Sequence, residues 1–161
     1  MVKVFVKKLS PKVELPSYKT SGASGMDLMA FIKSSVTIEP KTSSLIPTGL
    51  SIAFSENYEV QIRPRSGLAA KNNISVLNTP GTIDSDYRGE IKVIIYNHGN
   101  SDFLVNNKDR IAQMILTPVI KMEFEEVNEL PETIRGDGGF GSTGKWATYS
   151  IKKKSRDFQD K

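Results

Sequence analysis

Cysteine is absent from the 161 residues, and histidine occurs once, at His98. Without cysteine the chain has no disulfide, no thiolate metal site and no cysteine nucleophile. One histidine excludes multi-histidine zinc sites. A GxxxxGK(S/T) loop is also missing, which excludes the P-loop NTPases. The remaining chemistry uses carboxylates, arginines, hydroxyls and backbone amides, a set that suits phosphate chemistry with Mg²⁺, which prefers oxygen ligands.

Long apolar runs are absent as well. No run approaches the roughly 20 residues that a membrane-spanning helix needs, and residues 1–4 lack the apolar core of a signal peptide. We therefore expect a cytoplasmic protein that does not contact membranes. A hydrophobic fraction of 38% and a charged fraction of 25% fit a globular chain with a buried core.

The net charge of +4 is confined to the C-terminal tail. Residues 1–144 hold equal numbers of acidic and basic side chains, so they are neutral as a whole. Because the basic excess lies in the tail alone, it gives weak support to nucleic-acid binding, and we expect no nucleic-acid partner.

Short β-forming runs separated by turn residues dominate the chain. Val2, Val4 and Val6 alternate with other residues, as in a half-buried strand. Similar runs cover residues 35–38, 44–54, 58–63, 74–77, 90–96, 103–105 and 111–120. This spacing predicts an all-β fold, either an antiparallel sandwich, a jelly roll or a small barrel, with one short helix at residues 66–72.

The amino-acid composition changes near residue 131. Residues 135–144 include five glycines, which neither a strand nor a helix favours. We predict a β domain over 1–130, a flexible glycine-rich arm over 131–145 that orders against a ligand or partner, and a flexible basic tail over 146–161.

Four polar clusters could carry chemistry, and each has a plain structural alternative. On local grounds alone, Asp27, two residues after Gly25, fits an Asx turn better than a functional site. The segment 64–67, with an arginine and a hydroxyl before the helix, could bind an anion or simply cap the helix. Residues 109–113 fit a strand entry, and Arg135 with Phe140 fits a flexible linker.

A fifth segment, residues 78–90, contains the most charged residues. It holds Asp84, Asp86, Arg88 and Glu90 around a hairpin, immediately before an apolar strand. The alternative is a polar turn, but this number of charged groups exceeds what turn formation requires.

In this order the clusters resemble the five motifs of the trimeric dUTPase family. The matching segments are 25–28, 64–69, 81–90, 109–113 and 135–144, so the resemblance extends from residue 1 to about 145. It implies a jelly-roll-like β-sandwich or distorted barrel. It also implies a homotrimer with shared active sites, in which dUTP is hydrolysed at the α-phosphorus to dUMP and pyrophosphate with Mg²⁺. Such an enzyme keeps uracil out of DNA and supplies dUMP for dTMP synthesis.

The resemblance also implies roles for individual residues at the nucleoside end. Asp84 matches the aspartate that orients and deprotonates the attacking water. Tyr87 matches the ring that packs against deoxyribose and leaves no space for a 2′-hydroxyl. Asn78 faces the uracil, and Thr82 belongs to the same substrate-binding segment.

At the phosphate end the resemblance implies a second set of roles. The phosphate-binding positions are Arg65, Ser66, Gly67 and Gln113. Asp27 corresponds to the acid that holds Mg²⁺ through its waters. In the arm, Arg135 reaches the γ-phosphate and Phe140 covers the base, with Gly141 beside it as a further substrate-binding residue.

Two departures and three rival functions stay open. Lys108 and Asn73 stand where the family often has glycine. The rivals are a dCTP deaminase or bifunctional deaminase of the same fold, a non-catalytic nucleotide-binding sensor, and a basic-tailed nucleic-acid module.

Overall fold

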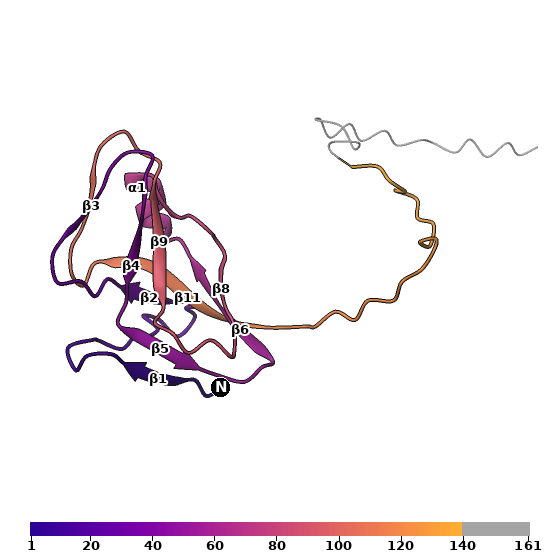
Figure 1. The fold of residues 1–161 in the computed structure, drawn as a ribbon, viewed down its shortest axis with the longest axis horizontal. Helices are drawn as coiled ribbons and strands as arrows, with labels where there is room; N and C mark the ends of the chain where they lie inside the picture. The colour runs from indigo at the N-terminus through magenta and orange to yellow at the C-terminus, as the bar shows by residue number, and fades with distance from the viewer. Residues whose placement is uncertain (140–161) are drawn as a thin grey trace, which may run out of the picture. The chain divides into compact units, whose positions relative to one another are not determined.

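The computed structural model describes residues 1–139, and the chain divides into two units, Met1–Lys121 and Met122–Lys161. All regular elements that the structure describes lie in the first unit (Figure 1). In chain order they are β1 (Phe5–Lys8), β2 (Met26–Met29), β3 (Val36–Ile38), β4 (Ser43–Pro47), β5 (Leu50–Ala53), β6 (Tyr58–Arg63), α1 (Ser66–Asn72), β7 (Ile74–Val76), β8 (Gly81–Ile83), β9 (Lys92–Asn97), β10 (Phe103–Val105) and β11 (Arg110–Pro118).

All strand pairs in the described part of the chain are antiparallel, and they form four sheets. The two larger sheets have the strand orders β2-β11-β6-β8 and β4-β9-β7, and the smaller ones pair β1 with β5 and β3 with β10. The predicted all-β class with one short helix is confirmed. The order is not sequential, which places segments far apart in the chain on neighbouring strands.

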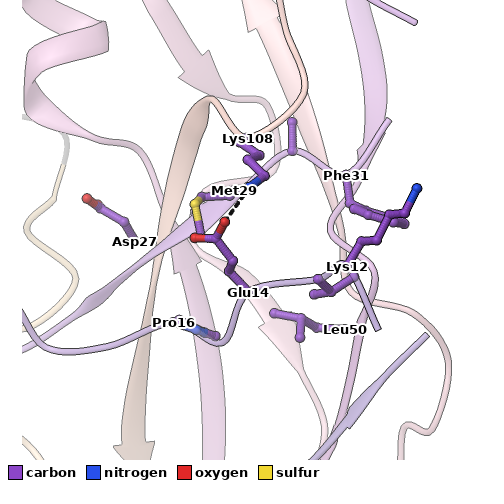
Figure 2. Close-up of a pocket in the computed structure, with 10 residues that line it drawn as sticks. Lys12, Glu14, Pro16, Asp27, Met29, Phe31, Leu50 and Lys108 are labelled. Atoms are coloured by element: carbon purple, nitrogen blue, oxygen red, sulfur yellow. Dashed lines mark hydrogen bonds and ion pairs between the residues drawn. The ribbon is translucent and has the colours of Figure 1, made fainter. Parts of the chain in front are cut away.

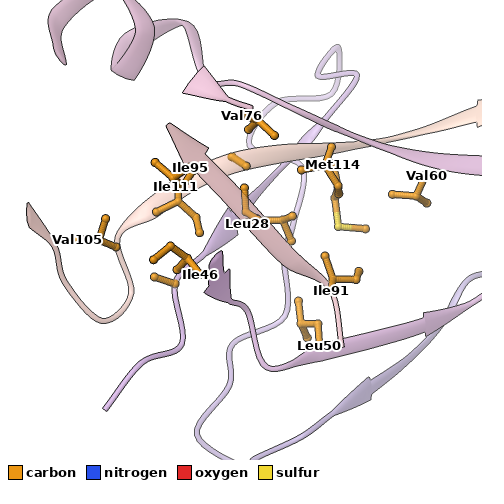
Figure 3. Close-up of a cluster of buried hydrophobic side chains, with 14 of the residues drawn as sticks. Leu28, Ile46, Leu50, Val60, Val76, Ile91, Ile95, Val105, Ile111 and Met114 are labelled. Carbon is orange, nitrogen blue, oxygen red and sulfur yellow. The ribbon is translucent and has the colours of Figure 1, made fainter. Parts of the chain in front are cut away.

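Apolar side chains from both larger sheets meet in one core (Figure 3). Burial alternates along the strands, as on β9, where Val93 and Ile95 are fully buried and Lys92 is exposed. Period-two alternation is what a strand with one buried face requires. Fully or almost fully buried members from other strands include Leu28, Ile46, Val60, Val76 and Ile111.

The predicted runs became strands, with two corrections. The run 44–54 is split into β4 and β5 by a turn at Gly49, which has a φ of +69°. β8 was not among the predicted runs, although it falls in the segment predicted to form a hairpin. Its three residues are too few to give a periodic signal, and β6 supplies their backbone partners.

The half-burial predicted for the N-terminal valines is wrong for two of them. Val2 and Val6 are 41% and 42% exposed, whereas Val4 packs against the core. All four residues of β1 are exposed, although the strand pairs with β5.

The two positions that depart from glycine both adopt left-handed backbone conformations. Asn73 ends α1 with a φ of 56°, and its N–H bonds to the carbonyl of Ala69. Lys108 has a φ of 71° in the turn before β11. Asparagine tolerates this region better than lysine does, so the lysine substitution carries the greater backbone strain.

Residues 122–139 of the second unit are mostly irregular, with a few bends and a turn and no strand or helix. No helix in the described part of the chain is long and apolar enough to cross a membrane. The expected cytoplasmic location stays a prediction.

We predict that Gly49→Ala lowers the free energy of unfolding by about 2–4 kcal/mol, because it combines a left-handed alanine with overpacking. A Cβ at this position would stand 2.5 Å from Cγ2 of Val13. Urea denaturation measures the change. Gly22→Ala is the matched control, since nothing lies within 4 Å of its Cβ. Equal stability of the two variants would contradict this account of the turn.

Candidate active site

The central strand β11 brings three of the polar clusters together. Gln113 on β11 is aligned with Asp27 on β2 and, on the other side, with Arg63 on β6. Because β6 ends at Arg63, the segment Pro64–Arg65 follows at the same level of the sheet. Segments 25–28, 64–67 and 109–113 therefore share one end of this sheet.

The carboxylate of Asp27 lies between two guanidinium groups. Nε of Arg65 donates to Oδ1 at 2.8 Å, and Nη1 of Arg110 donates to Oδ2 at 3.3 Å. Nη1 of Arg65 also donates to the carbonyl of Arg110 at 3.0 Å. The side chains of Asp27 and Arg65 are 20% and 27% exposed. Charge-assisted bonds at such partly buried positions fix the Arg65 guanidinium firmly.

The amide of Gln113 is held against the same turn. Its Nε2 donates to the carbonyl of Pro64 at 2.9 Å. Gly25 leaves room for it, because a Cβ there would stand 2.8 Å from Oε1 of Gln113. The glycine of the first motif therefore has a steric reason: it lets the backbone of one strand pass close to a functional amide.

Ser66 and Gly67 open α1 directly after Arg65. Both are exposed, and nothing lies within 4 Å of a Cβ built at Gly67. Arg65 occupies the N-cap without a side-chain capping bond, so no cap side chain takes up the amides of the first turn. The five predicted residues Asp27, Arg65, Ser66, Gly67 and Gln113 thus form one cluster, hereafter the anion cluster.

The hairpin residues form a second cluster around β8. The amide Nδ2 of Asn78 would lie 3.1 Å from a Cβ at Gly81, so the Asn78 side chain rests against the start of β8. Thr82 and Asp84 are exposed, on β8 and directly after it. The hydroxyl of Tyr87 donates to the carbonyl of Glu90 at 3.2 Å. These four predicted residues, Asn78, Thr82, Asp84 and Tyr87, are hereafter the hairpin cluster.

Within one chain Asp84 lies away from the anion cluster along β6, whereas Asn78 rests against Gly81, which pairs with Ile62 beside Arg63. Arg63 pairs with Gln113 of the anion cluster, whereas Val60 pairs with Ile83, the residue before Asp84. Three residue steps along β6 span about 10 Å. Asp84 lies beyond Val60, so its separation from Arg65 is greater than that. One chain does not bring its own Asp84 to its own anion cluster.

Arg135 belongs to the second unit, where its Nε donates to the carbonyl of Gly138 at 2.7 Å. Its predicted role at a phosphate stays a prediction. Phe140 and Gly141 lie outside the described residues.

Among residues 1–139, no group of three or more acidic, histidine or cysteine side chains could hold a metal ion. Asp27 is the acid of the anion cluster, and both of its oxygens face arginines. A single carboxylate nevertheless fits Mg²⁺, which keeps several waters and completes its shell with substrate phosphates.

Lys108 and Asp27 line the same pocket (Figure 2). Nζ of Lys108 pairs with Glu14 across the pocket, close to Met29. The hydrogen bond from Lys108, together with its charge, holds the pKa of Glu14 below its usual value.

Arg110 was not predicted as a site residue. It lies within the segment 109–113, but that segment gave no sign of its bond to Asp27.

Fold and clusters together define a class: an antiparallel β-sandwich with a cluster of arginines and amides suited to binding anions. The family model described as dUTPase matches residues 11–144. A deoxyuridine 5'-triphosphate nucleotidohydrolase of Fusobacterium nucleatum is 52% identical over 146 residues, covering 90% of this chain and 100% of the relative. A protein of the same name from Nautilia profundicola is 54% identical over 144 residues, with 89% and 100% covered. The chain belongs to the dUTPase family.

Solved structures agree on the fold. The dUTPase of Staphylococcus bacteriophage 80alpha, solved with dUPNHPP, superposes with a TM-score of 0.76 at 24% identity, covering 88% of this chain and 98% of that one. A mutant dUTPase from phage phi11 of S. aureus, whose structure contains a structural Mg(II) ion, gives 0.73 at 20% identity, with 81% and 99% covered. At these identities the likeness concerns the fold, which is the jelly roll of the dUTPases.

We predict that Asp27→Asn lowers the free energy of unfolding by about 1–3 kcal/mol, because two arginines lose their charged acceptor. Urea denaturation at neutral pH measures the loss. The control is Glu56→Gln, since the Glu56 side chain is 77% exposed beside Lys121, and we expect a change within about 0.5 kcal/mol. A neutral effect of Asp27→Asn would mean that the two arginines do not depend on the carboxylate.

Proposed function

We propose that the chain is a dUTP pyrophosphatase, which hydrolyses dUTP at the α-phosphorus to dUMP and pyrophosphate. The observation that carries the proposal is the register of β11, which gathers Asp27, Arg65 and Gln113 at one end of a sheet. Membership of the dUTPase family and two relatives of that activity, each matched over its whole length, support it. The activity keeps uracil out of DNA and supplies dUMP for dTMP synthesis.

The anion cluster would bind the triphosphate. Arg65 is fixed by Asp27 and by the carbonyl of Arg110, which leaves part of its fork for phosphate oxygens. Ser66 and the amides at Gly67 add neutral donors, and Gln113 presents an amide from the neighbouring strand. Donors held in place before binding do not need to be ordered by the ligand.

We propose Mg²⁺ as the metal, held by Asp27 through water. Bound there with the triphosphate, the ion would neutralise charge and align the α-phosphorus. The chain's own part is to provide one partly buried carboxylate beside the phosphate donors.

The hairpin cluster would hold the nucleoside and the attacking water. Asp84 is exposed at the end of β8, where it can position a water in line with the α-phosphorus and accept its proton. Tyr87 would pack on deoxyribose, and Asn78 and Thr82 would contribute to the pocket for uracil. A pocket built to bond one base edge rejects cytosine, whose amino group presents a donor in place of an acceptor.

A homotrimer would complete each site. Asp84 follows Ile83, which pairs with Val60 three residues from Arg63 along β6, so Asp84 would act at the anion cluster of a different chain. The arm would supply Arg135 to the γ-phosphate, with Phe140 and Gly141 over the base. Closure of the arm would exclude bulk water and strengthen these contacts.

The direct test is pyrophosphate release with Mg²⁺ from dUTP, with dCTP, dTTP and UTP assayed beside it. Release from dUTP alone supports the proposal. Ammonia or dUMP from dCTP would indicate a deaminase, and binding of dUTP without turnover would indicate a sensor.

We expect Asp84→Asn to reduce turnover of dUTP by about 10²–10⁴-fold, the usual contribution of a general base. The Kd for a non-hydrolysable imido analogue of dUTP should change little, because the aspartate acts on the water. Steady-state kinetics and calorimetry measure the two quantities. Asp86→Asn, in the same loop, is the matched control and should keep its turnover. Full turnover in Asp84→Asn would refute the assignment of the base.

Deletion of residues 135–161 should sharply reduce turnover and leave the thermal unfolding temperature nearly unchanged, because residues 1–121 contain the described core. Kinetics and thermal denaturation of the shortened chain provide the measurement. Normal turnover after the deletion would exclude the role proposed for the arm.

A further inference from the structure

The chain after the hairpin loop is bound to the turn between β4 and β5. Oε1 of Glu90 accepts from the N–H of Gly49 at 2.8 Å. The next residue, Ile91, is fully buried, and its N–H donates to the carbonyl of Leu50 at 2.8 Å. The hydroxyl of Thr48 donates to the carbonyl of Ile91 at 2.6 Å. Residues 48–50 therefore bond to the two consecutive residues Glu90 and Ile91.

Tyr87 depends on the same short segment. Its hydroxyl donates to the carbonyl of Glu90. Its ring lies against Gly89, where a Cβ would stand 2.3 Å from the hydroxyl oxygen and 2.5 Å from Cζ. The ring thus rests on the backbone of residues 89–90, and the Glu90 side chain, together with the N–H and carbonyl of Ile91, attaches that backbone to residues 48–50.

Asp84 is held from the other end of the loop. Ile83 pairs with Val60 on β6, so the residue after it inherits its position from the sheet. The loop 84–90 is therefore attached at both ends, through β8 before Asp84 and through Glu90 and Ile91 after Tyr87, and within it the N–H of Tyr87 bonds to the carbonyl of Asp84.

The donor in the bond between Glu90 and Gly49 has to be a glycine. Gly49 has a φ of +69°, and Val13 and Phe31 crowd the place of a Cβ, so glycine is required there. The other carboxylate oxygen of Glu90 lies 3.9 Å from Nζ of Lys92, a longer contact with an exposed side chain. The carboxylate itself is 22% exposed, which makes the charge-assisted bond to the amide its main interaction.

We propose that Glu90 is a positioning residue for Tyr87: by binding the Gly49 amide it fixes the tyrosine ring and so sets the enzyme's discrimination against ribonucleotides. This inference rests on the proposed function. It predicts that weakening the bond between Glu90 and Gly49 affects sugar recognition at Tyr87 and spares the chemical step at Asp84.

The test compares Glu90→Ala, Glu90→Gln and the control Lys92→Ala in kinetics with dUTP and UTP. Loss of a charge-assisted bond corresponds to about a tenfold effect. We expect Glu90→Ala to raise KM for dUTP by about that factor and to narrow the dUTP to UTP ratio of kcat/KM, with kcat for dUTP nearly unchanged. Glu90→Gln keeps an acceptor for the Gly49 amide, so its dUTP to UTP ratio of kcat/KM should stay close to that of the unmodified protein. Lys92→Ala should resemble the unmodified protein.

Amide hydrogen exchange gives a reading that does not depend on catalysis. The Gly49 amide should lose protection in Glu90→Ala and keep it in Glu90→Gln. Gly89→Ala, which leaves Glu90 intact, should displace the ring and narrow the dUTP to UTP ratio in the same way.

Two results separate failure of this inference from failure of the proposed function. If the unmodified protein releases no pyrophosphate from dUTP, the proposed function is wrong and this inference falls with it. If the unmodified protein is active but Glu90→Ala keeps its dUTP to UTP ratio, or loses kcat with KM unchanged, only the positioning role is overturned.

Discussion

The pairing of β11 with both β2 and β6 is the constraint on which the site depends. Antiparallel register fixes which residues stand side by side, and a shift of one residue would turn each side chain to the other face. At its present register Gln113 lies level with Asp27 and Arg63. The apolar residues of β11 decide this register, because Ile111, Ala112 and Met114 are buried in the core. Packing of the core therefore places the polar cluster.

Within that frame the functional side chains are held by backbone groups and by close approach at glycine. Gln113 donates to a carbonyl and passes close to Gly25, and Tyr87 donates to a carbonyl and rests on Gly89. Asp27 differs, because its partners are two guanidinium groups. These bonds orient the two arginines. If Asp27 also bound the waters of a metal ion, the carboxylate would be shared between the arginines and the metal site. Contacts within the chain thus organise the described part of the site.

Much of the fold followed from the pattern of residues. β6, β10 and α1 have the predicted boundaries, because their hydrophobic period and flanking turn residues are local signals. β8 was missed because three residues are too few to show a periodic pattern, and they become a strand beside β6. The exposure of Val2 and Val6 was missed because alternation predicts two faces and says nothing of what covers them. For the site, the motifs located the anion and hairpin clusters, but the bond from Arg110 to Asp27 had no sequence signal, since 83 residues separate the two.

By itself the sequence determined the all-β class, the family and the identity of the groups available for phosphate chemistry, because residue types and local periods are written in the chain. The tertiary structure alone decided which of those groups meet. Strand order and register joined β2, β6 and β11 from distant segments, and placed Asp84 away from Gln113 along β6. Non-local pairing depends on the burial of the whole core, and no single segment encodes it.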